Sequence, residues 1–130
     1  MLLCDYAQVA DGKLNMLGAG WSVTTGNAPF GIAILVLVPW DQANMRHAFR
    51  LELIDGDGNA VHGPDGQPIA LFGDLEVGRP PNTPHGIPLE SMLALNFAPI
   101  ALPPGQRWEW RLSVNEAPAA VCAFSTRPAR

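Results

Sequence analysis

The chain has 130 residues, a formal net charge of −4 and a pI near 5.1. That length suits a single domain over residues 1–130 and leaves no room for two ordinary ones. Apolar residues make up 48% and charged residues only 15%, which excludes intrinsic disorder. The 13 glycines and 13 prolines follow no period, so they indicate many turns rather than collagen.

Charge and cysteine usage limit the partners and the compartment. The eight basic residues form no run and are outnumbered by twelve acids, whereas nucleic acids and anionic membranes attract the opposite balance. The longest apolar run, residues 30–39, is too short to cross a bilayer. Asp5 interrupts the apolar opening, so no export signal is expected. Cys4 and Cys122 are therefore predicted to be free, buried thiols in a reducing cytoplasm.

Short runs of alternating apolar and polar residues fill the first half, a pattern that predicts strands rather than helices. Leu2–Val9 ends at Asp11-Gly12, a pair that favours a tight hairpin because both residues tolerate positive φ. The strands predicted here are Leu2–Val9, Lys13–Leu17, residues 30–38 and Arg46–Ile54, with residues 22–29 as a loop. Arg46–Ile54 alternates so that its apolar face points inward: His47, Phe49, Leu51 and Leu53.

The second half continues the same pattern. Asp55-Gly56-Asp57-Gly58 is a second hairpin signal, with a return through Asn59–His62, and three prolines make residues 79–86 a rigid loop. The remaining predicted strands are residues 67–77, 88–97, 106–114 and 119–125. About eight to nine strands joined by hairpin turns predict an all-β, single-domain antiparallel β-sandwich, in preference to a barrel.

Several motifs could carry chemistry, but each fits a structural role better. Asp55, Asp57 and Asn59 have the first spacings of a calcium loop, yet the later Gly and Glu of that loop are missing, which favours a hairpin turn. The histidines His47, His62 and His85 have no metal-ligand spacing. No nucleophile elbow or dinucleotide fingerprint is present. We expect no catalytic residue, no metal and no cofactor.

The aromatic residues divide into core and surface candidates. Trp108 and Trp110 share a face with Leu112 and Val114, which is typical of a core strand. Trp21 and Trp40 stand at strand ends, where an exposed ring could stack on a sugar or another small ligand. His85 lies in the proline-rich loop and is expected to be exposed. Trp21, Trp40 and His85 are therefore the candidate ligand-binding residues.

The strand over residues 30–38 is apolar on both faces. One face can fill the core of a sandwich, but Ala33, Leu35 and Leu37 on the other face need a second cover. Residues 79–88 or 99–105 could supply it, or the strand could be central in the sheet. Another subunit could equally cover these side chains, which makes them the candidate interface residues.

The opening of the chain resembles a family of short bacterial β-proteins of unknown function. The resemblance rests on Asp5, Ala7-Gln8-Val9, Asp11-Gly12-Lys13-Leu14 and Leu17-Gly18-Ala19-Gly20-Trp21, and Leu53–Gly58 fits as well. It implies a small β-sandwich and supplies no activity and no catalytic residue.

The sequence predicts a cytoplasmic, non-enzymatic module that binds itself or another protein, with no nucleic acid and no membrane as partner. The two-sided apolar strand, the low charge and the missing catalytic constellation support this interpretation. The alternative is a small-ligand or carbohydrate-binding sandwich that uses an exposed tryptophan at the loop end.

Overall fold

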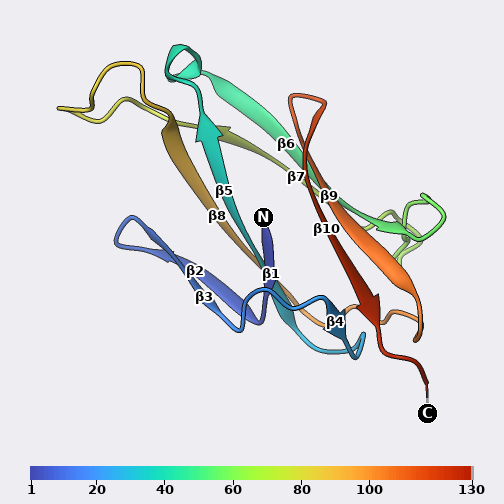
Figure 1. The fold of residues 1–130 in the computed structure, drawn as a ribbon. Coiled ribbons are helices and arrows are strands. Elements are labelled where there is room, and N and C mark those ends of the chain that lie inside the picture. Colours follow the sequence, from blue (N-terminus) through green and yellow to red (C-terminus); the bar gives the residue numbers. More distant parts are fainter. Residues whose placement is uncertain (130) are drawn as a thin grey trace.

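The computed structural model describes residues 1–129, which form ten strands and one 3₁₀ turn (Figure 1). In chain order these elements are β1 (Leu2–Cys4), β2 (Tyr6–Ala10), β3 (Lys13–Leu17), β4 (Val23–Thr24), β5 (Phe30–Val38), η1 (Trp40–Gln42), β6 (Arg46–Asp55), β7 (Ala70–Glu76), β8 (Leu89–Phe97), β9 (Arg107–Val114) and β10 (Ala117–Thr126). The prediction of an all-β domain is confirmed.

The strands form two facing sheets and a separate hairpin. One sheet has the order β1-β5-β8, and the other has the order β4-β10-β9-β6-β7. Every strand pair is antiparallel except β4 with β10, which is parallel. β2 and β3 pair with each other and lie against the outer side of β5 and β8 (Figure 1).

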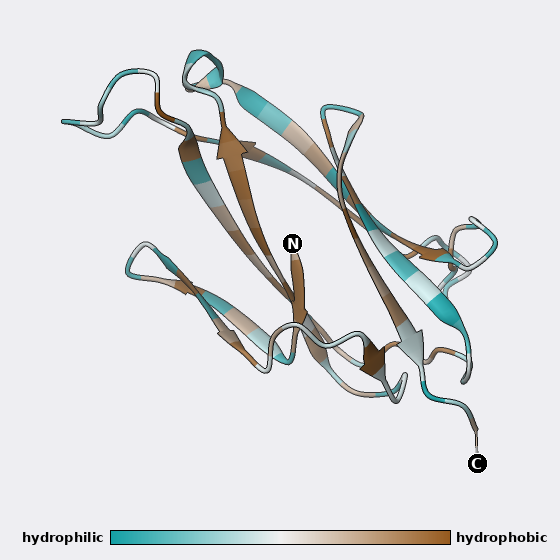
Figure 2. Ribbon diagram, viewed as in Figure 1, coloured by the Kyte–Doolittle hydropathy of each residue, from teal (hydrophilic) through white to brown (hydrophobic). Residues whose placement is uncertain are grey.

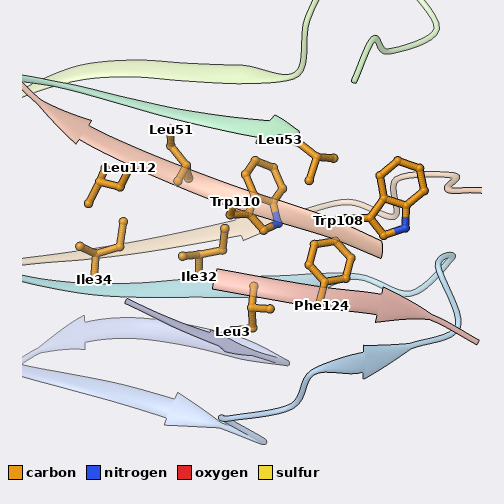
Figure 3. Packing of buried hydrophobic residues seen from close by; sticks show 9 residues of the cluster. All are labelled: Leu3, Ile32, Ile34, Leu51, Leu53, Trp108, Trp110, Leu112 and Phe124. Carbon is orange, nitrogen blue, oxygen red and sulfur yellow. The ribbon is translucent and has the colours of Figure 1, made fainter. Parts of the chain in front are cut away.

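The core lies between the two sheets. Leu3, Ile32 and Ile34 reach it from the three-stranded sheet and meet side chains of β6, β9 and β10 from the other (Figure 3). Those side chains are Leu51, Leu53, Trp108, Trp110, Leu112 and Phe124. Trp110 is 1% exposed, so the prediction that the β9 tryptophans belong to the core is confirmed. Burying one large apolar side chain contributes about 1.5–3 kcal/mol, and this cluster is the largest such contribution in the fold.

Most predicted turns are confirmed. Asp11 and Gly12 adopt φ of 53° and 68°, the left-handed values that a two-residue hairpin requires. At the second hairpin signal, the Asp55 carboxylate accepts hydrogen bonds from the backbone N–H groups of Asp57 and Asn59, both 2.9 Å long. The aspartate therefore organises its own turn, as the hairpin interpretation expects.

Three predicted boundaries are wrong. Residues 59–62 and 67–69 make only isolated bridges, so β7 begins at Ala70. The predicted loop 22–29 contains β4. The predicted strand Leu2–Val9 is interrupted at Asp5, whose N–H donates to the carbonyl of Leu17. This break lets β1 pair with β5 while β2 leaves the sheet.

β2 crosses the three-stranded sheet at a single tight point. The side-chain amide of Asn96 on β8 accepts a hydrogen bond from the N–H of Ala7 (3.0 Å) and donates one to its carbonyl (2.8 Å). Beneath this contact lies Gly31, where an added Cβ would meet Asn96 Oδ1 at 2.7 Å and Cys4 Sγ at 3.1 Å. The hairpin can approach the sheet this closely because residue 31 has no side chain.

Gly31→Ala is expected to destabilise the fold by about 1–3 kcal/mol, because the methyl group overpacks the crossing point. Elsewhere in a strand, the same change would stabilise slightly by reducing the chain entropy of the unfolded state. Chemical denaturation measures the difference. Gly56→Ala is the matched control, since a Cβ there meets nothing closer than 3.5 Å; equal stability of the two variants would contradict the argument.

Candidate functional site

β5 is apolar along its whole length (Figure 2). Ile32 and Ile34 point into the core and are at most 1% exposed. On the opposite, outer face the register places Ala33 beside Ala94 of β8, and Leu35 beside Met92. The sequence therefore predicted correctly that both faces of this strand are apolar, and the outer face is the candidate site.

The β2–β3 hairpin covers one end of that face. Ala33 is 2% exposed and is buried in a small cluster with Cys4 and Ala7, against which Leu14 and Ala94 pack. Residues 79–88 or 99–105 were one alternative for the cover, but at Ala33 the hairpin supplies it instead, and β5 is the central strand of its sheet, which was another alternative. Ala33 is also not a free interface residue, because a hairpin of the same chain already covers it.

The rest of the outer face remains uncovered. Leu35 is 46% exposed and Leu37 is 59% exposed, with half-buried Met92 beside Leu35. We call Leu35, Leu37 and Met92 the outer patch. On the hairpin, Val9 and Met16 share the side of Ala7 and Leu14, yet they are 44% and 38% exposed. The hairpin therefore presents more apolar surface than its own sheet covers.

The outer face of the other sheet is different in character. Arg50 pairs with Glu52 and Arg111 pairs with Glu109, each at 3.0 Å, and the Arg50 guanidinium lies 5.2 Å from the ring centroid of Phe72. These partly exposed ion pairs stabilise the fold little, but they surround the exposed Phe72 and Val121 of that face with charged groups. The outer patch differs from that face because none of its three residues, Leu35, Leu37 and Met92, is charged or forms an ion pair.

Trp40 and His85, far apart in the sequence, come together after the end of β5. Their ring centroids are 4.9 Å apart, and the Arg79 guanidinium lies 4.5 Å from the Trp40 ring and donates to the Trp40 carbonyl. Trp40 is half-buried, whereas Arg79 and His85 are exposed. Arg79 was missed by the sequence analysis, because no local spacing connects it to Trp40.

Trp21 belongs elsewhere. It packs edge-on against Phe30 and Phe124, with ring centroids 6.3 Å and 6.0 Å away. Phe30 is the first residue of β5, whereas Trp40 follows its last residue, so the two tryptophans lie at opposite ends of this strand. The indole nitrogen of Trp21, like that of Trp110, is buried without a hydrogen-bond partner, and both residues line the same small cavity. Trp21 is half-buried rather than fully exposed, and the structure does not join it to Trp40 and His85 in one site.

The remaining candidates do not form a reactive cluster. Both ring nitrogens of buried His47 are engaged, one with the carbonyl of Gln42 (3.0 Å) and one with the amide of Asn115 (2.9 Å). His62 borders an open, mainly apolar hollow between residues 61–71 and 97–101. Within residues 1–129 no three His, Cys, Asp or Glu side chains are placed to hold a metal ion.

The two cysteines are free, as predicted; Cys4 is buried, whereas Cys122 is only half-buried. Burial raises the pKa of the Cys4 thiol, and the nearby Asp5 carboxylate raises it further. Burial also raises the pKa of Cys122, whose thiol donates to the carbonyl of Met1. Neither thiol has the lowered pKa that marks a reactive cysteine.

The fold and its surface define an all-β sandwich domain with a crossing hairpin and one partly uncovered apolar sheet face. The chain belongs to a family of unknown function (DUF6941), whose model matches residues 1–126. No curated protein and no solved structure matches the chain. The resemblance to an uncharacterised family agrees with this result, while the bacterial origin and the specific opening signature stay predictions. None of the described residues lies in a helix that is long and apolar enough to span a membrane.

Asn96→Ala is expected to lower the free energy of unfolding by about 1–3 kcal/mol, because it leaves the backbone of Ala7 without its partner beneath the hairpin. Amide hydrogen exchange at Ala7 should accelerate at the same time. Asn15→Ala serves as the control, since the Asn15 amide only reaches the carbonyl of Lys13 on the exposed side of the hairpin. If the two variants were equally stable, Asn96 would not anchor the hairpin.

Proposed function

We propose that this protein is a non-enzymatic protein-binding module that associates with a second copy of itself through the outer patch. The observation that carries the proposal is the exposure of Leu35 and Leu37 on a regular strand, next to a hairpin with its own exposed apolar side chains. A contiguous apolar surface of this kind marks interaction sites in soluble proteins. With 15% charged residues, the chain has little charge to keep such a surface apart from another copy.

The location and the partners follow from the same interpretation. Two free thiols support a reducing compartment such as the cytoplasm. The net charge of −4 supports a protein partner over a nucleic acid or an anionic membrane. No cofactor is part of the proposal.

The solution mass tests this function directly. At tens of micromolar, sedimentation velocity should give twice the chain mass of 13.9 kDa. Leu35→Glu should raise the dimer dissociation constant at least tenfold, because it places an unpaired carboxylate in the contact. Val121→Glu is the matched control. Val121 is a 57% exposed strand residue on the outer face of the other sheet, opposite Arg111. A strict monomer, or equal weakening by both variants, would overturn the proposal.

A second candidate function is the binding of a small ligand beside Trp40. Leu37, Pro39, Trp40, Asp41, Gly86 and Pro88 line a surface hollow. An aromatic ring next to a carboxylate is a combination that neutral sugars favour, because the ring contacts C–H groups and the carboxylate accepts from hydroxyls. Arg79 already lies over the Trp40 ring, so the hollow offers only part of the ring to a ligand.

For this candidate, titration with glucose and other neutral pyranoses should change tryptophan fluorescence at millimolar concentration. Trp40→Ala should abolish the change. Tyr6→Ala, an exposed aromatic residue on the hairpin, should leave it intact. A flat titration in the wild-type protein across the panel would remove carbohydrate binding as a function.

A further inference from the structure

The four edge strands of the two sheets are protected unequally. β1 has three residues and β4 has two, which are too short to template another strand. β7 has seven, but it carries Asp74 and Glu76 and is weakened by Gly73. β8 has nine residues with a single charge, Glu90, no glycine or proline, and a continuous register with β5. Such an edge is a template for a further strand.

We propose that two copies of this chain associate by antiparallel pairing of β8 with the partner's β8, centred on Leu93. The proposal rests on the self-association inferred above and specifies its geometry. Pairing about a twofold axis is self-complementary, as closed dimers require. It would join the two three-stranded sheets into one six-stranded sheet of order β1-β5-β8-β8-β5-β1.

The register follows from the alternation of side chains. Directly opposed residues must lie on the same face of the joined sheet, so even-numbered β8 residues face even-numbered partners. Centring on Leu93 is the register that pairs all nine residues. It places Met92 opposite the partner's Ala94, a large side chain beside a small one. Glu90 then faces the partner's Asn96, and the two Glu90 carboxylates stay apart.

This register also explains why the outer patch and the Val9 and Met16 side chains of the hairpin are both exposed in a single chain. Leu35 lies beside Met92, and Ala33 lies beside Ala94. The joined sheet therefore has a row that runs from Leu35 and Met92 to the partner's Ala94 and Ala33. The partner's Ala33 lies beneath the partner's hairpin, where Val9 and Met16 have apolar surface to spare.

Each hairpin is thus placed next to the outer patch of the other copy. β2 starts beside β1, crosses β5 and reaches Asn96 on β8, so its continuation leads toward the added strand. In Figure 1 the turn of the hairpin projects away from the sheet rather than folding back onto it. Dimer formation would then bury Leu35 and Met92 of one copy under Val9 and Met16 of the other.

Disulfide cross-linking tests the register. In a Cys122→Ser background, Leu93→Cys should form a covalent dimer under mild oxidation, because residue 93 faces its own copy within disulfide reach. Glu90→Cys on the same strand should stay uncross-linked, since the two copies of residue 90 are separated by six residues of strand, about 20 Å. Should Leu93→Cys fail to fold, the double variant M92C/A94C tests the same register from the outer face.

The outcomes separate this inference from the proposed function. A covalent dimer at residue 93, with residue 90 unreacted, supports β8 pairing. A dimer by sedimentation that fails to cross-link at 93 and in M92C/A94C overturns the register but leaves self-association standing. Cross-linking of Leu37→Cys instead would assign the contact to packing of one outer patch on the other. A monomer by sedimentation overturns both.

Discussion

The crossing of β2 over β5 is the constraint on which the surface of this protein depends. Asn96 gives the backbone of Ala7 the two hydrogen bonds that a neighbouring strand would otherwise supply. Gly31 leaves the space in which those bonds can form. Together they hold the hairpin against the sheet with a polar contact and a small apolar cluster around Cys4 and Ala33. Without this crossing, the outer face of β5 would be exposed from one end to the other.

The crossing also divides the molecule into surfaces of different chemistry. The five-stranded sheet shows paired arginines and glutamates to solvent beside the exposed Phe72 and Val121, so its outer face mixes charged and apolar groups. The outer face of the three-stranded sheet is covered by the hairpin around Ala33 and is open at Leu35 and Leu37. The interaction that we propose would give this difference a physical reason, because the open part of the face adjoins β8, a strand edge with a single charge.

The sequence was sufficient to predict what depends on neighbours in the chain. Alternation identified the strands and the buried face of β6 and β9, and Asp11-Gly12 identified the first turn. It could not show what depends on distant residues. The hairpin finds its partner 89 residues away at Asn96, and an isolated polar residue in an apolar run carries no pattern that reveals this. Trp40 and Arg79 likewise meet 39 residues apart, whereas Trp21 was assigned to the surface because a strand end is locally indistinguishable from a core edge.

The long separation between Ala7 and Asn96 has a consequence for synthesis on the ribosome. The hairpin has all its own residues by position 17, but its docking partner emerges only with β8. During that interval β5, nine residues without a charge, has its neighbour β1 but lacks β8, its other neighbour in the sheet. Such a segment is prone to intermolecular β-pairing until β8 has been synthesised and can pair with it. The yield of native protein should therefore depend on how quickly residues 38–97 are translated. It should also depend on chaperones that bind nascent β5 until β8 has been synthesised.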